Sequence, residues 1–137
     1  TLYISGYINR NKSKYYDLLL NVTKNNNWEE YILFMLEGFY QQAKETKELL
    51  FKIMKELRSL KERLKKDYSK IYSYDLIEAL YAYPIITPIK LSEKTNVHWT
   101  TAKRHLDTLS KDGILEERKV GKYHLYINKD LIKILHT

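Results

Sequence analysis

The sequence predicts a mainly α-helical protein that carries one small β-hairpin near its C-terminal end. Two observations predict this fold class. Apolar residues recur at helical spacing from residue 28 onward, with no proline before Pro84. Two short segments with alternating side chains, 114–120 and 123–128, then follow, and Gly121 stands between them.

Composition limits the class of protein. The chain has 137 residues and no cysteine, so disulfides, thiolate metal sites and cysteine nucleophiles are excluded. No apolar run approaches the roughly 20 residues that span a bilayer, and no signal-peptide pattern is visible. We therefore expect a cytoplasmic protein with no membrane partner. The net charge of +7 favours an acidic partner such as nucleic acid.

The N-terminal part predicts three helices. Two short ones, 2–9 and 12–24, are interrupted near residues 9–11, and Asn27 is expected to cap a third, with Glu30 in the capping-box position. The third helix carries a wide apolar face that is typical of a core helix. This face consists of Tyr31, Ile32, Met35, Leu36 and Phe39.

Beyond Gly38 the apolar stripe narrows and resembles a coiled-coil seam. Its residues are separated by three or four positions and are surrounded by lysine, arginine and glutamate; they are Leu50, Ile53, Leu57, Leu60 and Leu64. The strong part spans about two heptads, which is short for a coiled coil. The stripe therefore predicts either a homodimer interface or packing within the chain.

A charged stretch at 61–70 suggests a domain boundary near residue 70, which divides the chain into 1–70 and 71–137. The second part begins with a helix that Pro84 closes. Thr87 can cap the next helix, 88–95, because Pro88 suits its first position. A short helix at 129–135 ends the chain.

The helix predicted over 98–112 is amphipathic. Ala102, Leu106 and Leu109 form its inner stripe, and Gly113 can end it in a left-handed cap. Its outer side is basic and bears one aromatic ring and hydroxyl groups, from Trp99, Thr100, Lys103 and Arg104. In the hairpin that follows, Tyr123, Leu125 and Ile127 alternate with His124 and Tyr126.

Three helices followed by a two-stranded hairpin resemble the winged helix-turn-helix domains of bacterial regulators. The positions that match are His98, Thr101, Arg104, Leu109, Gly113, Ile114 and Leu115, and His98 stands where a serine cap is usual. The match covers about residues 72–137 and implies that the 98–112 helix is a recognition helix.

The first half resembles the last helices of bacterial Fic-family proteins, many of which carry a C-terminal winged helix. The matching positions are Leu2, Tyr3, Ser5, Tyr7, Ile8, Asn11, Tyr15, Tyr16, Leu19, Val22, Trp28, Phe34, Leu36, Glu37, Gly38, Ala43, Glu45 and Thr46. Fic proteins transfer AMP from ATP to a hydroxyl of a protein target. The resemblance therefore implies a nucleotidyltransferase parent that uses ATP and magnesium.

The catalytic loop of that family is missing from this sequence. It runs from His-Pro-Phe to Gly-Asn-Gly-Arg, and neither a His-Pro nor a Gly-Asn-Gly stretch occurs here. We expect the loop to lie upstream of Thr1, since the sequence starts inside an amphipathic helical pattern. No catalytic residue is carried over, and by itself this chain is expected to be no enzyme and to need no cofactor.

DNA is the expected partner of the recognition helix and the wing. Arginine can read guanine in the major groove, and lysines near a hairpin tip suit phosphate. Thr101 could bind a phosphate or cap the helix. The candidate residues are Trp99, Thr100, Thr101, Lys103, Arg104, Arg118, Lys119 and Lys122.

Two other functions compete with DNA binding. The winged helix could bind a protein target for the transferase, or the leucine stripe could form a homodimer. His98 and His105 could share a helix face as zinc ligands, but no third ligand is placed, so we assign no metal site and favour capping and surface roles.

Overall fold

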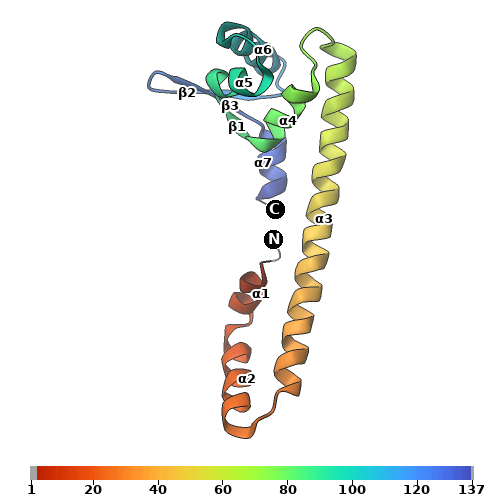
Figure 1. Cartoon of the computed structure of the whole chain (residues 1–137), viewed down its shortest axis with the longest axis vertical. Coiled ribbons are helices and arrows are strands. Elements are labelled where there is room, and N and C mark those ends of the chain that lie inside the picture. Colours follow the sequence, from red (N-terminus) through yellow and green to blue (C-terminus); the bar gives the residue numbers. More distant parts are fainter. Residues whose placement is uncertain (1–2, 137) are drawn as a thin grey trace. The chain divides into compact units, whose positions relative to one another are not determined.

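The computed structural model describes residues 3–136, which form seven α-helices and three short β-strands (Figure 1). The family-pattern position Leu2 lies outside the described residues. Contacts divide the chain into two compact units, one ending at Phe51 and the other starting at Lys52. The predicted mainly α-helical fold with a C-terminal winged helix is confirmed. The domain boundary near residue 70 stays a prediction.

The first unit contains α1 (Ile4–Arg10), α2 (Lys12–Asn25) and the first part of α3 (Glu29–Asp67). Asn26 ends α2 with a φ of 53°, a left-handed conformation that asparagine adopts more readily than most residues. Its side chain accepts a hydrogen bond of 2.9 Å from the Trp28 indole. Helix α3 therefore begins at Glu29, and Asn27 lies two positions before it rather than at the predicted cap position.

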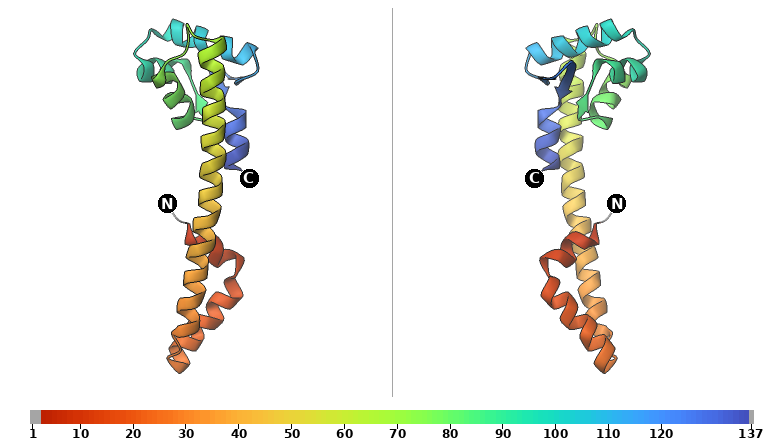
Figure 2. Two further views of the ribbon diagram at one scale, coloured as in Figure 1. Left: turned by 90° about the vertical axis from the view of Figure 1, so that its right-hand side faces the viewer. Right: turned by 90° about the vertical axis from the view of Figure 1, so that its left-hand side faces the viewer.

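Aromatic rings join the three helices of this unit. The Tyr7 and Tyr15 ring centroids lie 5.1 Å and 6.3 Å from that of Phe34, which is buried. Arg10 Nη2 donates to Glu45 Oε1 at 3.0 Å. Both views in Figure 2 show α1 and α2 alongside the start of α3. The short helices thus cover the side of α3 that carries Phe34.

Gly38 allows α1 to approach α3 closely. A Cβ atom at this position would lie 2.6 Å from Tyr7 Cδ1 and 2.7 Å from Ile4 Cδ1. Any side chain would push α1 away, so this glycine has a packing role.

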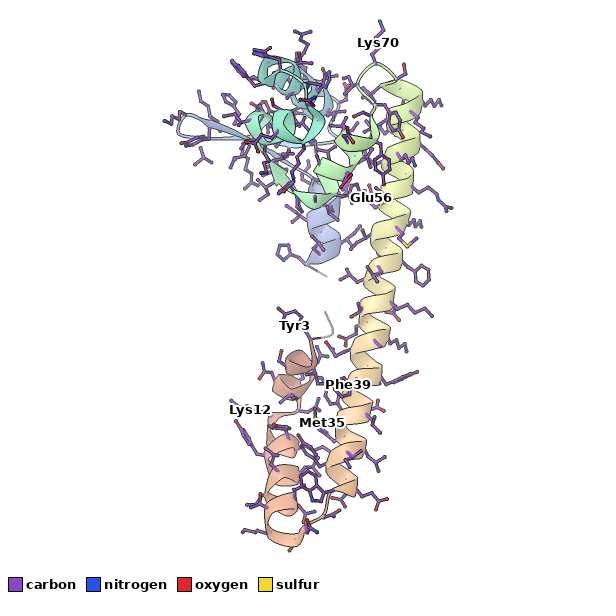
Figure 3. All side chains as sticks on the ribbon, in the orientation of Figure 1. Tyr3, Lys12, Met35, Phe39, Glu56 and Lys70 are labelled. Atoms are coloured by element: carbon purple, nitrogen blue, oxygen red, sulfur yellow. The ribbon has the colours of Figure 1, made fainter. Side chains whose placement is uncertain are left out.

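The wide apolar face predicted for α3 is not a core face within the described residues. Ile32, Leu36 and Phe39 are 49%, 57% and 43% exposed. Met35 and Phe39 are labelled on this stretch in Figure 3. The prediction was wrong here because α1 and α2 cover the side that carries Phe34 and Gly38, whereas these three residues remain exposed.

The second unit contains α4 (Tyr74–Ala82), α5 (Pro88–Thr95) and α6 (Trp99–Lys111) after the end of α3. Ser73 Oγ accepts from Leu76 N at 3.0 Å at the start of α4. Thr87 Oγ1 accepts from Lys90 N at 3.3 Å, and Pro88 takes the first position of α5. The predicted Thr87 cap is confirmed.

A three-stranded antiparallel sheet follows, in the order β1 (Ile85–Ile86), β3 (Tyr123–Ile127), β2 (Glu116–Val120). Gly121 has a φ of 60° at the first position of the two-residue turn, as a type II′ hairpin requires. The sequence did not predict β1, which pairs with β3 through Ile85↔Ile127 and Ile86↔Tyr126. Helix α7 (Lys129–Leu135) follows the sheet.

The end of α3 belongs to the core of the second unit. Leu60 and Leu64 are 7% and 0% exposed and lie in the same buried cluster as Leu80, Leu91 and Leu106. Leu60 and Leu64 therefore pack within the chain. The prediction that all five stripe residues form a dimer seam is wrong at these two positions. Self-association through the remaining Leu50, Ile53 and Leu57 stays a prediction.

Candidate nucleic-acid interface

Helix α6 packs into the core through its inner stripe, and a capping residue defines its start. Ala102, Leu106 and Leu109 are all 0% exposed. His98 caps the helix, since its Nδ1 accepts from Thr100 N at 3.4 Å. Gly113 follows the helix with a φ of 74°, as predicted.

The outer side of α6 has three exposed candidates, Trp99, Thr100 and Arg104. Trp99 is 52% exposed. Thr101 is half-buried inside the helix and does not cap it, because His98 takes the cap position. Lys103 is also half-buried, and its Nζ binds Asp107 Oδ2 at 2.7 Å. A phosphate would therefore have to compete with Asp107 for Lys103, which the sequence analysis had placed on the outer face.

The wing bears the other three candidates, and all are exposed. Arg118 Nε lies 2.7 Å from Glu116 Oε1 in an ion pair, whereas Lys122 Nζ lies 5.5 Å from the Tyr123 ring centroid. Within residues 3–136, Arg104, Lys119 and Lys122 take part in no ion pair. These three cations can exchange water for phosphate without first breaking a contact to a carboxylate.

A hydrogen-bonded network connects the hairpin to α6. Tyr126 is fully buried, and its hydroxyl donates to Asp107 Oδ1, the same carboxylate that binds Lys103. His124 Nδ1 lies 2.6 Å from Glu117 Oε1 on the neighbouring strand. Tyr126 is thus the aromatic residue that β3 contributes to the core. Leu125 is half-buried, and Tyr123 is 58% exposed.

The network also affects ionisation. Burial raises the pKa of the Asp107 carboxyl, but the hydrogen bonds from Lys103 and Tyr126 outweigh burial, and the pKa is lowered. Burial, together with the hydrogen bond to Asp107, raises the pKa of the Tyr126 hydroxyl. Asp107 is therefore charged and Tyr126 neutral at neutral pH, which keeps the bond that sets the wing against α6.

We expect Tyr126→Phe to lower the free energy of unfolding by about 1–3 kcal/mol, because it removes a hydrogen bond to a charged acceptor and leaves the ring in place. Urea unfolding measures the change. Tyr74→Phe is the matched control, since Tyr74 is 69% exposed. Equal stability of the two variants would show that the Tyr126 hydroxyl contributes nothing.

A pocket of about 550 Å³ lies between the starts of α5 and α6 and the hairpin. Its lining consists of Thr87, Pro88, Ile89, Lys90, Glu93, Trp99, Lys103, Lys122, Tyr123 and His124. The sequence analysis had assigned only Trp99, Lys103 and Lys122 to a site. Tyr123 was missed because strand alternation placed it with Leu125 and Ile127, whereas its ring is 58% exposed at the pocket.

Within residues 3–136, no group of three histidine or carboxylate side chains could hold a metal ion. None of the helices in that range is both long and apolar enough to cross a membrane.

Residues 57–131 match the family described as the C-terminal domain of SoFic-like protein adenylyltransferases. That match covers more than half of the chain. The chain belongs to the SoFic-like family. The expected resemblance to the C-terminal part of a Fic-family protein is thereby confirmed, and the matched SoFic-like region contains α4, α5, α6 and the whole sheet.

Among solved structures, a type III plasmid segregation protein, TubR, is similar to this SoFic-like chain. The sequences are 16% identical, the match covers 58% of this chain and 81% of that one, and the TM-score is 0.39.

Proposed function

We propose that the winged helix of this SoFic-like chain binds DNA in a regulatory role through α6 and the wing. One observation carries the proposal. Arg104 on α6 and Lys119 and Lys122 on the wing are exposed, are free of ion pairs within the described part of the chain, and are carried by elements that share one core. A basic surface on two rigid elements suits a duplex, whose phosphates form two parallel rows.

The roles of the residues follow from their chemistry. Arg104 and Thr100 face outward from α6 and can reach base edges in the major groove. Lys122 lies in the hairpin turn and Lys119 lies near the end of β2, where both can contact phosphate. Trp99 lies at the start of α6 and contributes an apolar surface.

Fluorescence anisotropy with a pool of mixed duplexes at low salt tests this proposal. We expect Arg104→Ala to weaken binding by about 1–3 kcal/mol if Arg104 reads a base. Arg58→Ala, which removes the same charge from an exposed position on α3, is the control and should change binding much less. No binding of any duplex at low salt would reject the DNA role.

A second function is favoured by the apolar character of the same surface. Ile89, Val120 and Tyr123 are 64%, 57% and 58% exposed, and clustered apolar side chains are typical of sites that bind proteins. In that case the winged helix would hold a protein target for AMP transfer by the parent enzyme. Binding to such a target would depend weakly on salt, whereas DNA binding depends on it strongly.

A further inference from the structure

The pocket between α5, α6 and the hairpin is assigned no ligand by the function proposed above. Its volume of about 550 Å³ lies in the range of about 300–1,000 Å³ that is usual for small-ligand sites. Three separate segments form it, and each belongs to an element whose other side packs into the core. The backbone segments that carry the lining are therefore held by the core.

Two aromatic rings line this pocket without contributing to the core. Trp99 comes from α6 and Tyr123 from β3, and they are 52% and 58% exposed. The His98 ring lies 6.0 Å from that of Trp99 and is tilted by 39°, so it supports the indole from the side of the helix cap. Pro88 and Ile89 add apolar surface at the start of α5. A flat apolar group suits this lining.

The charges around the pocket favour an anion. Three lysines line it, against the single carboxylate of Glu93. Glu93 binds Lys90 at 3.2 Å, and Lys103 binds Asp107. Lys122 binds no carboxylate within residues 3–136, and its Nζ lies over the Tyr123 ring, 5.5 Å from the ring centroid. A ligand with both a flat ring and a negative charge would contact the ring and the lysine together.

We propose that this pocket takes one unpaired nucleobase, with Lys122 at its phosphate, so that the domain prefers DNA with an unpaired nucleotide over fully paired duplex. The inference rests on the proposed DNA binding and adds a substrate class to it. Aromatic rings interleaved with cations are the usual means of holding single-stranded nucleic acid. In a paired duplex the faces of the bases are covered by their neighbours, and only their edges are accessible.

The lining also distinguishes this ligand from a protein partner. Lysine is depleted in the cores of protein–protein interfaces, where arginine and aromatic residues are enriched. All three cations of this pocket are lysines. An acidic peptide with an apolar anchor is therefore the less favoured occupant, and it becomes an outcome of the test.

The test compares three duplexes of one sequence by anisotropy: fully paired, with one bulged base, and with an abasic site at the bulge. We expect the bulged duplex to bind at least about fivefold more tightly than the other two, which corresponds to one stacked base. Trp99→Ala and Tyr123→Ala should each remove this preference. Tyr74→Ala changes an exposed ring outside the pocket and should preserve it.

A direct readout comes from tryptophan fluorescence. The chain has two tryptophans, so a Trp28→Phe background leaves Trp99 as the only one. We expect the bulged duplex to quench Trp99 and the abasic duplex to leave it nearly unchanged.

Equal affinity for the paired and bulged duplexes would overturn the inference and leave the proposed DNA binding intact. No affinity for any of the three would overturn both. Quenching of Trp99 by an acidic peptide that contains phenylalanine, without a response to the bulged duplex, would assign the pocket to a protein partner instead.

Discussion

Leu64→Ala is expected to lower the free energy of unfolding by about 2–5 kcal/mol, whereas Leu50→Ala should change it by no more than about 0.5 kcal/mol. Both substitutions remove the same atoms from the same helix. Leu64 is 0% exposed inside the winged-helix core, and its removal leaves a cavity among Leu60, Leu80 and Leu106. Leu50 is 54% exposed, so its removal uncovers little new surface.

This pair of substitutions also separates the two roles that the sequence left open for the leucine stripe. In a coiled-coil dimer both leucines would face the second copy and both would matter. Urea unfolding at two protein concentrations measures the outcome. A large cost of Leu50→Ala that shrinks as the protein is diluted would show that the exposed part of the stripe forms a dimer, because dilution dissociates the dimer of the unchanged chain and removes its extra stability. Equal, small costs at both positions would contradict the core assignment of Leu64.

Local signals accounted for much of the winged helix. Thr87 followed by Pro88 suits a helix start, and Gly113 and Gly121 adopt positive φ at little cost, as a helix end and a hairpin turn require. Such residues mark element ends through local chemistry, so these ends could be predicted from the sequence. The candidate residues exposed on α6, Trp99, Thr100 and Arg104, followed from the same periodicity.

Features that depend on distant segments could not be predicted in this way. Strand β1 has two residues, and its partner β3 lies some forty positions later in the chain. The spacing of Leu60 and Leu64 is the same whether they face a second copy or their own chain. Periodicity also indicated that one face of α3 is apolar without indicating what covers it, and Ile32 and Leu36 are exposed.

The pocket is the clearest example of such a feature. It joins residues near 88, 99 and 123, and no spacing rule connects them. Some ion pairs could be predicted from sequence spacing. Lys103 and Asp107 are four positions apart on one helix, a spacing that brings side chains together, whereas Arg118 and Glu116 meet on one side of a strand.

The affinity for duplex DNA is expected to fall about 12-fold between 50 mM and 200 mM salt. Each phosphate contact contributes about −0.9 to the slope of log affinity against log salt, because it releases a condensed counterion. Two cations assigned to phosphate, Lys119 and Lys122, are free of ion pairs within the described residues, which gives a slope of about −1.8. If Lys103 and Arg118 also contacted phosphate, the slope would be about −3.6 and the loss about 150-fold.

Single substitutions assign the slope to individual residues. We expect Lys119→Ala to reduce its magnitude by about 0.9, since one counterion fewer is released. Lys103→Ala should change it little, because the ammonium of Lys103 already binds Asp107 at 2.7 Å. Lys66→Ala, at an exposed position near the end of α3, is the control for a general loss of charge. Anisotropy titrations at four salt concentrations measure each slope. A slope near zero in a chain that still binds would mean that no phosphate is contacted, and the apolar surface around Trp99 and Tyr123 would then be the part that binds.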